Sequence, residues 1–164
     1  MKRLTLLRHG KSPQSSGMRD HERPLADKGR QGVVKVADSF VSKGWTVDWA
    51  VSSTAKRAVE TGRLFLHCLQ TPCELTLENA LYLSAPEEIL RQIQSVPDIT
   101  SSLLLVGHNP GFGVVADACC GATGLPCAMK PGTAAIFQVD IDSWIDFRPA
   151  LCRPDAFLKI DMGA

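Results

Sequence analysis

Short apolar runs alternate along this chain with longer segments in which apolar residues recur every three or four positions. Each short run has the length and composition of a buried strand, bounded by polar or turn-forming residues. The pattern predicts five strands and, at the end of the chain, a candidate edge strand. Their ranges are Leu4–Leu7, Trp49–Ser52, Glu74–Leu77, Leu103–Val106, Ala134–Val139 and, for the edge strand, Ala156–Ile160.

Four segments have apolar residues at the spacing of an α-helix. Three of them lie between the first four strands, and one follows the fourth strand. The clearest begins near Thr54 and ends at Leu69, because its apolar residues fall on one stripe of a helix. A third helix is expected after Ser84, where Ser84 and Glu87 have the spacing of a capping box and Pro86 suits the first turn. The four predicted helices are 27–43, 54–69, 84–97 and a fourth that begins after Asn109-Pro110-Gly111 and ends at Gly121.

Strands that alternate with helices predict parallel βαβ units and a sheet covered on both faces. A chain of 164 residues, 45% of them hydrophobic, is long enough for one core. We therefore expect an α/β fold: a single three-layer α/β/α domain over residues 1–164, with a mostly parallel central sheet.

Composition excludes several classes of protein. The net charge of +1 gives no field for nucleic acid, and no stretch reaches the roughly 20 apolar residues of a membrane helix. The apolar run after Lys2 and Arg3 is too short for a signal peptide, so we expect a cytoplasmic monomer. The six cysteines contain no CxxC pair, and we expect them to be reduced and to lie in the apolar core.

Basic side chains, arginines and histidines, follow three of the predicted strands. Arg8 and His9 end the first, Arg57 falls in the first turn of the helix after the second, and His108 follows the fourth. In open α/β sheets, ligands bind beyond the carboxyl ends of the strands. These four residues are therefore expected to form one positively charged pocket.

A phosphoryl group is the ligand that such a pocket fits. Its charge is spread over three oxygens, which guanidinium and imidazole groups match, and histidine can attack phosphorus directly. A metal site on His9 and His108 is disfavoured because an arginine accompanies each, so we expect neither metal nor cofactor. Gly111 and Gly113 lack the third glycine of a dinucleotide loop.

Three ordered motifs resemble the histidine phosphatase superfamily, in its phosphoglycerate mutase-like branch. They are Leu7-Arg8-His9-Gly10, the segment Ser52 to Thr61, which contains the pattern S-x-x-x-R-A-x-x-T, and Val106-Gly107-His108-Asn109-Pro110. The chain length, the segment Asp20 to Leu25 and the pair Leu81-Tyr82 look most similar to SixA-type phosphohistidine phosphatases. The resemblance covers nearly the whole chain.

The resemblance implies a phosphoglycerate mutase-like fold and a role for each matching residue. His9 would be the catalytic nucleophile that becomes phosphorylated, and Arg8, Arg57 and His108 would bind the phosphoryl oxygens. Arg23 and Asn109 are further candidates for substrate binding. Ser15 and Ser16 either cover the site or form a solvated linker, and His21 and His67 are expected at the surface.

The chain departs from the branch in one respect. Mutases and many ester phosphatases carry a glutamate general acid and an inserted cap after the third strand, and no such segment is found here. Glu87 and Glu88 fit the start of a helix, which leaves Glu78 or Asp20 as an alternative acid. A phosphoramidate needs less acid assistance than an ester.

These features favour a phosphatase for phosphohistidine on a protein, such as a histidine phosphotransfer domain. A phosphatase for small phosphate esters, or a non-catalytic phosphate-binding or phosphoprotein-binding member of the superfamily, remains the alternative.

Overall fold

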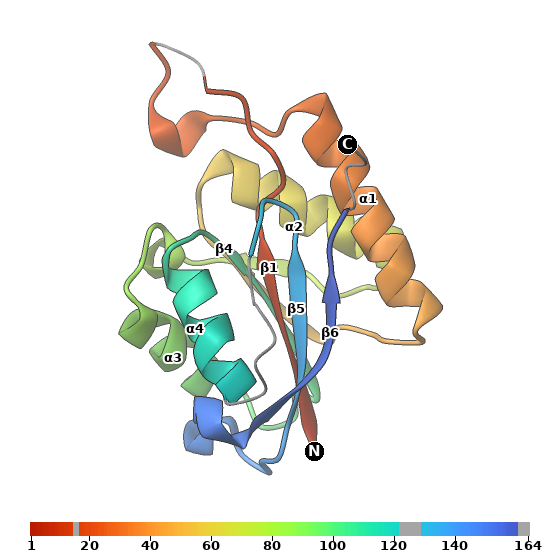
Figure 1. Cartoon of the computed structure of the whole chain (residues 1–164), viewed down its shortest axis with the longest axis vertical. Coiled ribbons are helices and arrows are strands. Elements are labelled where there is room, and N and C mark those ends of the chain that lie inside the picture. Colours follow the sequence, from red (N-terminus) through yellow and green to blue (C-terminus); the bar gives the residue numbers. More distant parts are fainter. Residues whose placement is uncertain (15–16, 122–128, 161–164) are drawn as a thin grey trace.

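The computed structural model describes residues 1–14, 17–121 and 129–160, and its centre is a six-stranded sheet (Figure 1). The strand order is β3-β2-β4-β1-β5-β6. Neighbouring strands among the first four are parallel, whereas β5 runs antiparallel to β1 and β6 antiparallel to β5, so the prediction of a mostly parallel sheet is confirmed. The strands are β1 Lys2–Arg8, β2 Trp49–Ser52, β3 Leu75–Leu77, β4 Ser102–Gly107, β5 Ala134–Val139 and β6 Cys152–Leu158.

Helices cover both faces of the sheet, as Figure 1 shows. The helices are α1 Asp27–Ser42, α2 Lys56–Leu69, α3 Pro86–Gln94 and α4 Gly111–Cys120. Side chains of β4 alternate between the two faces: Leu105 packs in the core beneath α3 and α4, and Leu104 in the core beneath α1 and α2. The predicted three-layer α/β/α architecture is therefore confirmed.

Two local predictions are wrong. The last strand begins at Cys152 rather than Ala156, because Pro154 is accommodated in an edge strand, beside a register shift between Ile136 and Phe137 of β5. Helix α3 has Ala85 rather than Ser84 as its N-cap residue, and no side-chain hydrogen bond caps it. Pro86 occupies its first turn as expected.

Two short 3-10 helices lie close to the carboxyl ends of the strands. Helix η1 (Asp20–Glu22) follows the loop after β1 and packs against α2, and η2 (Asn79–Leu81) follows β3. Both add side chains to the rim of the region in which the sequence places the pocket.

The described cysteines follow the expectation in part: Cys119 and Cys120 are buried, Cys68, Cys73 and Cys152 are half-buried, and Cys127 lies outside the described residues. Cys68, Cys73, Cys119 and Cys152 are free thiols, and Cys119 is buried. Cys120 is disulfide-bonded, against the expectation that the cysteines are reduced. Within the described residues, no helix is long and apolar enough to cross a membrane.

Candidate active site

His9 directly follows β1, and its main chain is held from two sides. Its N–H donates to the carbonyl of Gly107 at 3.1 Å, and its own carbonyl accepts from the N–H of Gly132 at 2.9 Å. The ring Nδ1 lies 2.8 Å from the carbonyl oxygen of Gly10. Because a carbonyl can only accept, the ring proton is on Nδ1, and Nε2 carries the lone pair.

Arg57 connects the two histidines of the site. It lies in the first turn of α2, is 2% exposed, and directs its Nε toward Nε2 of His9 at 3.4 Å. Its Nη2 lies 3.4 Å from Nδ1 of His108. The guanidinium is thus placed beside the lone pair of His9 and between the strand ends of β1 and β4.

Thr61, one turn further along α2, fixes this arrangement. Its buried hydroxyl accepts the N–H of Gly10 at 3.0 Å and donates to the carbonyl of Arg57 at 2.7 Å. The threonine that ends the second sequence motif therefore ties the loop after His9 to the helix that carries Arg57.

His108 follows β4 and is buried beside His9. The two rings are 5.1 Å apart between centroids and tilted by 51°. Because an arginine N–H must donate, Nδ1 of His108 is the acceptor toward Arg57, and Nε2–H donates to the hydroxyl of Ser53 at 2.8 Å. Ser53 also accepts the N–H of Ala55 at 3.1 Å, which orients its hydroxyl.

The environment keeps both histidines neutral. Burial lowers the pKa of His9 from 6.5 to about 4, against the hydrogen bond to Gly10, which raises it; the charges of Arg57, Arg8 and Arg23 lower it further. Burial, His9 and Arg57 lower the pKa of His108 from 6.5 to about 3. Near neutral pH the arginines carry the positive charge, and Nε2 of His9 is free to act as a nucleophile.

Arg8 supplies a second guanidinium at the end of β1. Its Nη1 donates to the carbonyl of Met129 at 2.9 Å, whereas its buried Nε has no hydrogen-bond partner within the described part of the chain. Burial, and then Arg57, lower the pKa of Arg8. A buried donor without a partner is costly, and an anion bound beside it would satisfy it.

Asp20, on η1, accepts hydrogen bonds from both Nη atoms of Arg57. Its Oδ2 accepts from Nη2 of Arg57 at 3.0 Å and from the Tyr82 hydroxyl, and its main-chain carbonyl accepts from Nη1 of Arg57 at 2.6 Å. Arg23 donates to its Oδ1 through Nε and Nη2. The Tyr82 hydroxyl, followed by Arg23 and Arg57, holds the pKa of Asp20 well below its usual range, so this carboxylate is ionised.

Two other candidates from the sequence have main-chain partners. Asn109 donates from Nδ2 to the carbonyl of Met129 at 2.8 Å and accepts the N–H of Gly113 at 3.1 Å, so its amide links the start of α4 to Met129. Oε1 of Glu78 accepts the N–H of Ala80 at 3.1 Å and caps η2. Each of these side chains is therefore held to the main chain through at least one of its polar atoms.

Of the remaining candidates, His21 lies beside this centre and His67 does not. Nε2 of His21 is 2.8 Å from the hydroxyl of Thr54, and its ring packs edge-on against Tyr82. His67 is in the last turn of α2, remote from β1 in the helix, and Ser15 and Ser16 lie outside the described residues. Among the residues that the structure describes, no group of three or more His, Cys, Asp or Glu could hold a metal ion.

Sequence reasoning missed Ser53 and Tyr82 as parts of the site. Ser53 falls within the second motif, but only its contact with His108 gives it a role. Tyr82 is the single tyrosine of the chain and reaches Asp20 from the segment after η2. A long separation in the sequence hides both relations: the first depends on how β2 and β4 are paired, and the second on the paths of the segments that follow β1 and β3.

Comparisons with known proteins identify the family of this chain. The model of the histidine phosphatase superfamily (branch 1) matches residues 4–81, and the chain belongs to this superfamily. An uncharacterized chloroplastic protein of Arabidopsis thaliana is 32% identical over 158 residues, which cover 87% of this chain and 69% of that protein.

Solved structures of SixA share the fold over nearly the whole chain. A candidate phosphohistidine phosphatase SixA from Agrobacterium tumefaciens matches with a TM-score of 0.83 and 24% identity, covering 97% of this chain and 98% of that one. The protein histidine phosphatase SixA complexed with tungstate matches with a TM-score of 0.80 and 18% identity, covering 96% of each chain. Within the superfamily, the fold is therefore the phosphoglycerate mutase-like fold of SixA.

Proposed function

We propose that this protein is a phosphatase that removes the phosphoryl group from phosphohistidine on another protein, through a covalent intermediate on His9. The observation that carries the proposal is the neutral ring of His9, with its Nε2 lone pair beside Arg57 and His108. Family membership supports phosphatase chemistry in general, and the chemistry of the site supports this substrate class.

In the first step, Nε2 of His9 forms a bond to phosphorus as the phosphorus–nitrogen bond of the substrate breaks. The donors of Arg8 and Arg57 and the ring of His108 stabilise the charge on the equatorial oxygens. A substrate imidazole that is protonated on its other nitrogen leaves as a neutral ring, with the electron pair of the broken bond. This step needs no proton from a carboxyl group.

In the second step, water attacks the phosphorus of phospho-His9, which releases inorganic phosphate and restores the neutral ring. The same guanidinium groups stabilise both transition states, since each passes through the same phosphoryl position. We propose Asn109 and Arg23 as positioning residues for Met129 and Asp20, rather than as direct ligands of the phosphoryl group.

Ionised Asp20 and the capping role of Glu78 support a substrate whose leaving group needs no general acid. An alkoxide leaves slowly without a proton donor, whereas imidazole does not. The partner is therefore expected to be a phosphorylated protein, for example a histidine phosphotransfer domain, and the positive charge of the arginines makes a metal cofactor unnecessary.

The first test is to trap the intermediate. The protein is mixed with labelled phosphohistidine protein and quenched, and we expect acid-labile, base-stable label on His9. His9→Ala should remove both label and turnover, because Nε2 of His9 is the nitrogen that forms the bond to phosphorus, whereas the matched variant His67→Ala should keep both. Label on a different residue would contradict the assignment of His9.

The second test is to compare substrates, in the presence and absence of a chelator. We expect a higher kcat/KM for the phosphohistidine protein than for sugar phosphates, and no effect of the chelator. A sugar phosphate hydrolysed far faster, with Glu78→Gln losing that rate, would identify an ester phosphatase instead. Phosphate binding without turnover of any substrate, including an activated aryl phosphate, would identify a non-catalytic member.

A further inference from the structure

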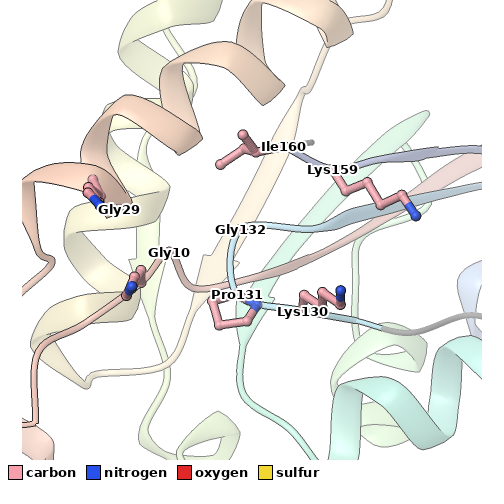
Figure 2. Close-up of a pocket in the computed structure, with 9 residues that line it drawn as sticks. Gly10, Gly29, Lys130, Pro131, Gly132, Lys159 and Ile160 are labelled. Atoms are coloured by element: carbon pink, nitrogen blue, oxygen red, sulfur yellow. The ribbon is translucent and has the colours of Figure 1, made fainter. Parts of the chain in front are cut away.

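A second pocket, of about 440 Å³, opens beside the loop that follows His9 (Figure 2). It lies between the start of α1, the loop before β5 and the end of β6. None of the side chains of Arg8, His9, Arg57 and His108 lines it. Its lining consists of Gly10, Lys11, Lys28, Gly29, Lys130, Pro131, Gly132, Lys159 and Ile160.

Glycine main chain forms much of the wall of this pocket. A Cβ on Gly29 would lie 2.2 Å from the carbonyl oxygen of Lys11, and one on Gly10 would lie 3.0 Å from the carbonyl oxygen of Gly29. Gly132 has a positive φ of +80°, which favours glycine, and its N–H donates to the carbonyls of Arg8 and His9. The wall is therefore rigid, and no side chain fills the hollow from this direction.

The charge of the pocket is entirely positive. Lys11, Lys28, Lys130 and Lys159 line it and are exposed, and no carboxylate is among the lining residues. Within the described residues, none of the four ammonium groups takes part in an ion pair. Because the whole chain has a net charge of only +1, this concentration of cations is local.

The shape and the apolar part of the pocket favour a small molecule. Figure 2 shows Pro131 and Ile160 beside the hollow, with Lys130 and Lys159 on the same side and Gly10 and Gly29 on the other. Sites for small organic ligands span about 300–1,000 Å³ and combine apolar walls with a few polar groups. An acidic protein surface would need a broader, flatter area than this one.

We propose that this pocket is a binding site for a small organic anion that carries two or more negative charges, of the nucleoside diphosphate type. The lysine ammonium groups bind the phosphoryl oxygens, and Pro131, Ile160 and the lysine stems pack against the organic part. The site is separate from the catalytic pocket, and the proposal does not depend on the substrate of the phosphatase.

The test is a calorimetric titration of the full chain with ADP at low ionic strength. We expect saturable binding, no binding of adenosine, and an affinity that falls as salt is added. The double variant Lys130→Gln/Lys159→Gln should bind ADP about tenfold more weakly, since it removes two of the positive charges that face the phosphoryl groups. Lys35→Gln, an exposed lysine of α1 that does not line the pocket, should bind as the wild type does.

A second titration separates this site from the catalytic one. Saturating orthovanadate, an anion that fits the phosphoryl position of the catalytic pocket, should leave the affinity for ADP unchanged. Displacement of ADP by orthovanadate, with no effect of the lysine changes, would assign the binding to the catalytic site and overturn the proposal. Absence of ADP binding, or tighter binding of a glutamate-rich peptide than of ADP, would overturn it as well.

Discussion

Asp20 uses donors of Arg57 that an incoming phosphoryl group would also need. Both Nη atoms of Arg57 donate to Asp20, one to its carboxylate and the other to its main-chain carbonyl. The carboxylate thereby places a negative charge next to the position where a dianion has to bind. Its charge would therefore lower the affinity for phosphate. Its hydrogen bonds, in contrast, hold the guanidinium of Arg57 in one orientation.

Removal of this charge should strengthen the binding of inorganic phosphate. We expect Asp20→Asn to lower the inhibition constant of phosphate about fivefold, because the repulsion between two charges near a protein surface is on the order of 1 kcal/mol. The constant is measured as competitive inhibition of aryl phosphate hydrolysis. Glu22→Gln, which removes an exposed charge from the same 3-10 helix, is the matched control. An unchanged constant for Asp20→Asn would show that the carboxylate does not oppose phosphate.

The two buried histidines predict a loss of stability in mild acid. In the folded chain their pKa values are lowered from 6.5 to about 4 for His9 and to about 3 for His108. At a pH between the lowered value and 6.5, each histidine is protonated in the unfolded chain and neutral in the folded one. The free energy of unfolding is therefore expected to fall as the pH is lowered below about 6.5, by roughly 2 kcal/mol per histidine at about pH 5.

Urea unfolding at neutral and mildly acidic pH measures this effect. His108→Asn, which cannot be protonated in this range, should make the free energy of unfolding less dependent on pH. If the free energy of unfolding falls by the same amount on acidification in the wild type and in His108→Asn, protonation of His108 is not a cause of the loss.

At the scale of elements, a buried hydroxyl links α2 to the loop after β1. Thr61 accepts the N–H of Gly10 and donates to the carbonyl of Arg57, and it is fully buried. One side chain thus couples the helix that carries Arg57 to the loop that follows His9. Its loss should affect both stability and the position of His9.

Thr61→Val keeps the shape of the side chain and removes the hydroxyl. We expect a loss of about 1–3 kcal/mol in the free energy of unfolding, the usual cost of a buried donor without a partner. We also expect kcat to fall more than KM rises, because the ring of His9 loses its alignment. Thr61→Ser restores the hydroxyl and should recover most of the rate, whereas a purely structural role would leave kcat in Thr61→Val unchanged.

The elements that the sequence predicts well are those with a clear apolar period. The bounds of β2 and β5 are as predicted, and α2 ends at Leu69 as predicted. The error in β6 arises because a proline usually excludes a strand, and only the position at the edge of the sheet admits Pro154. Ser84 fails as a cap because the loop from η2 enters α3 one residue later.

The residues of the candidate site that follow the ends of strands could be predicted from the sequence. Arg8, His9, Arg57 and His108 lie together because β2, β4 and β1 are adjacent and parallel, which the βαβ pattern implies. The hydrogen bonds of Asp20 to Arg57 and Tyr82 were not predictable, because they depend on the path of irregular segments. Such paths leave no periodic signal in a sequence.

At the scale of the whole molecule, positive charge gathers at one edge of the sheet. Arg8, Arg57 and the lysine-lined pocket lie near the carboxyl end of β1, whereas the whole chain has a net charge of +1. We therefore expect anions to be attracted to this edge in particular, and the attraction to weaken as salt is added.

The two outer strands of the sheet also determine how the protein behaves at high concentration. An exposed strand edge can recruit the same strand of another copy and start an intermolecular sheet. Here β3 has only 3 residues, and β6 has Pro154 between the exposed side chains of Arg153 and Asp155. Neither edge offers a long row of unpaired backbone groups, so we expect the chain to stay monomeric and to resist aggregation. Pro154→Val should increase self-association in light scattering, because it restores a backbone donor to the open edge.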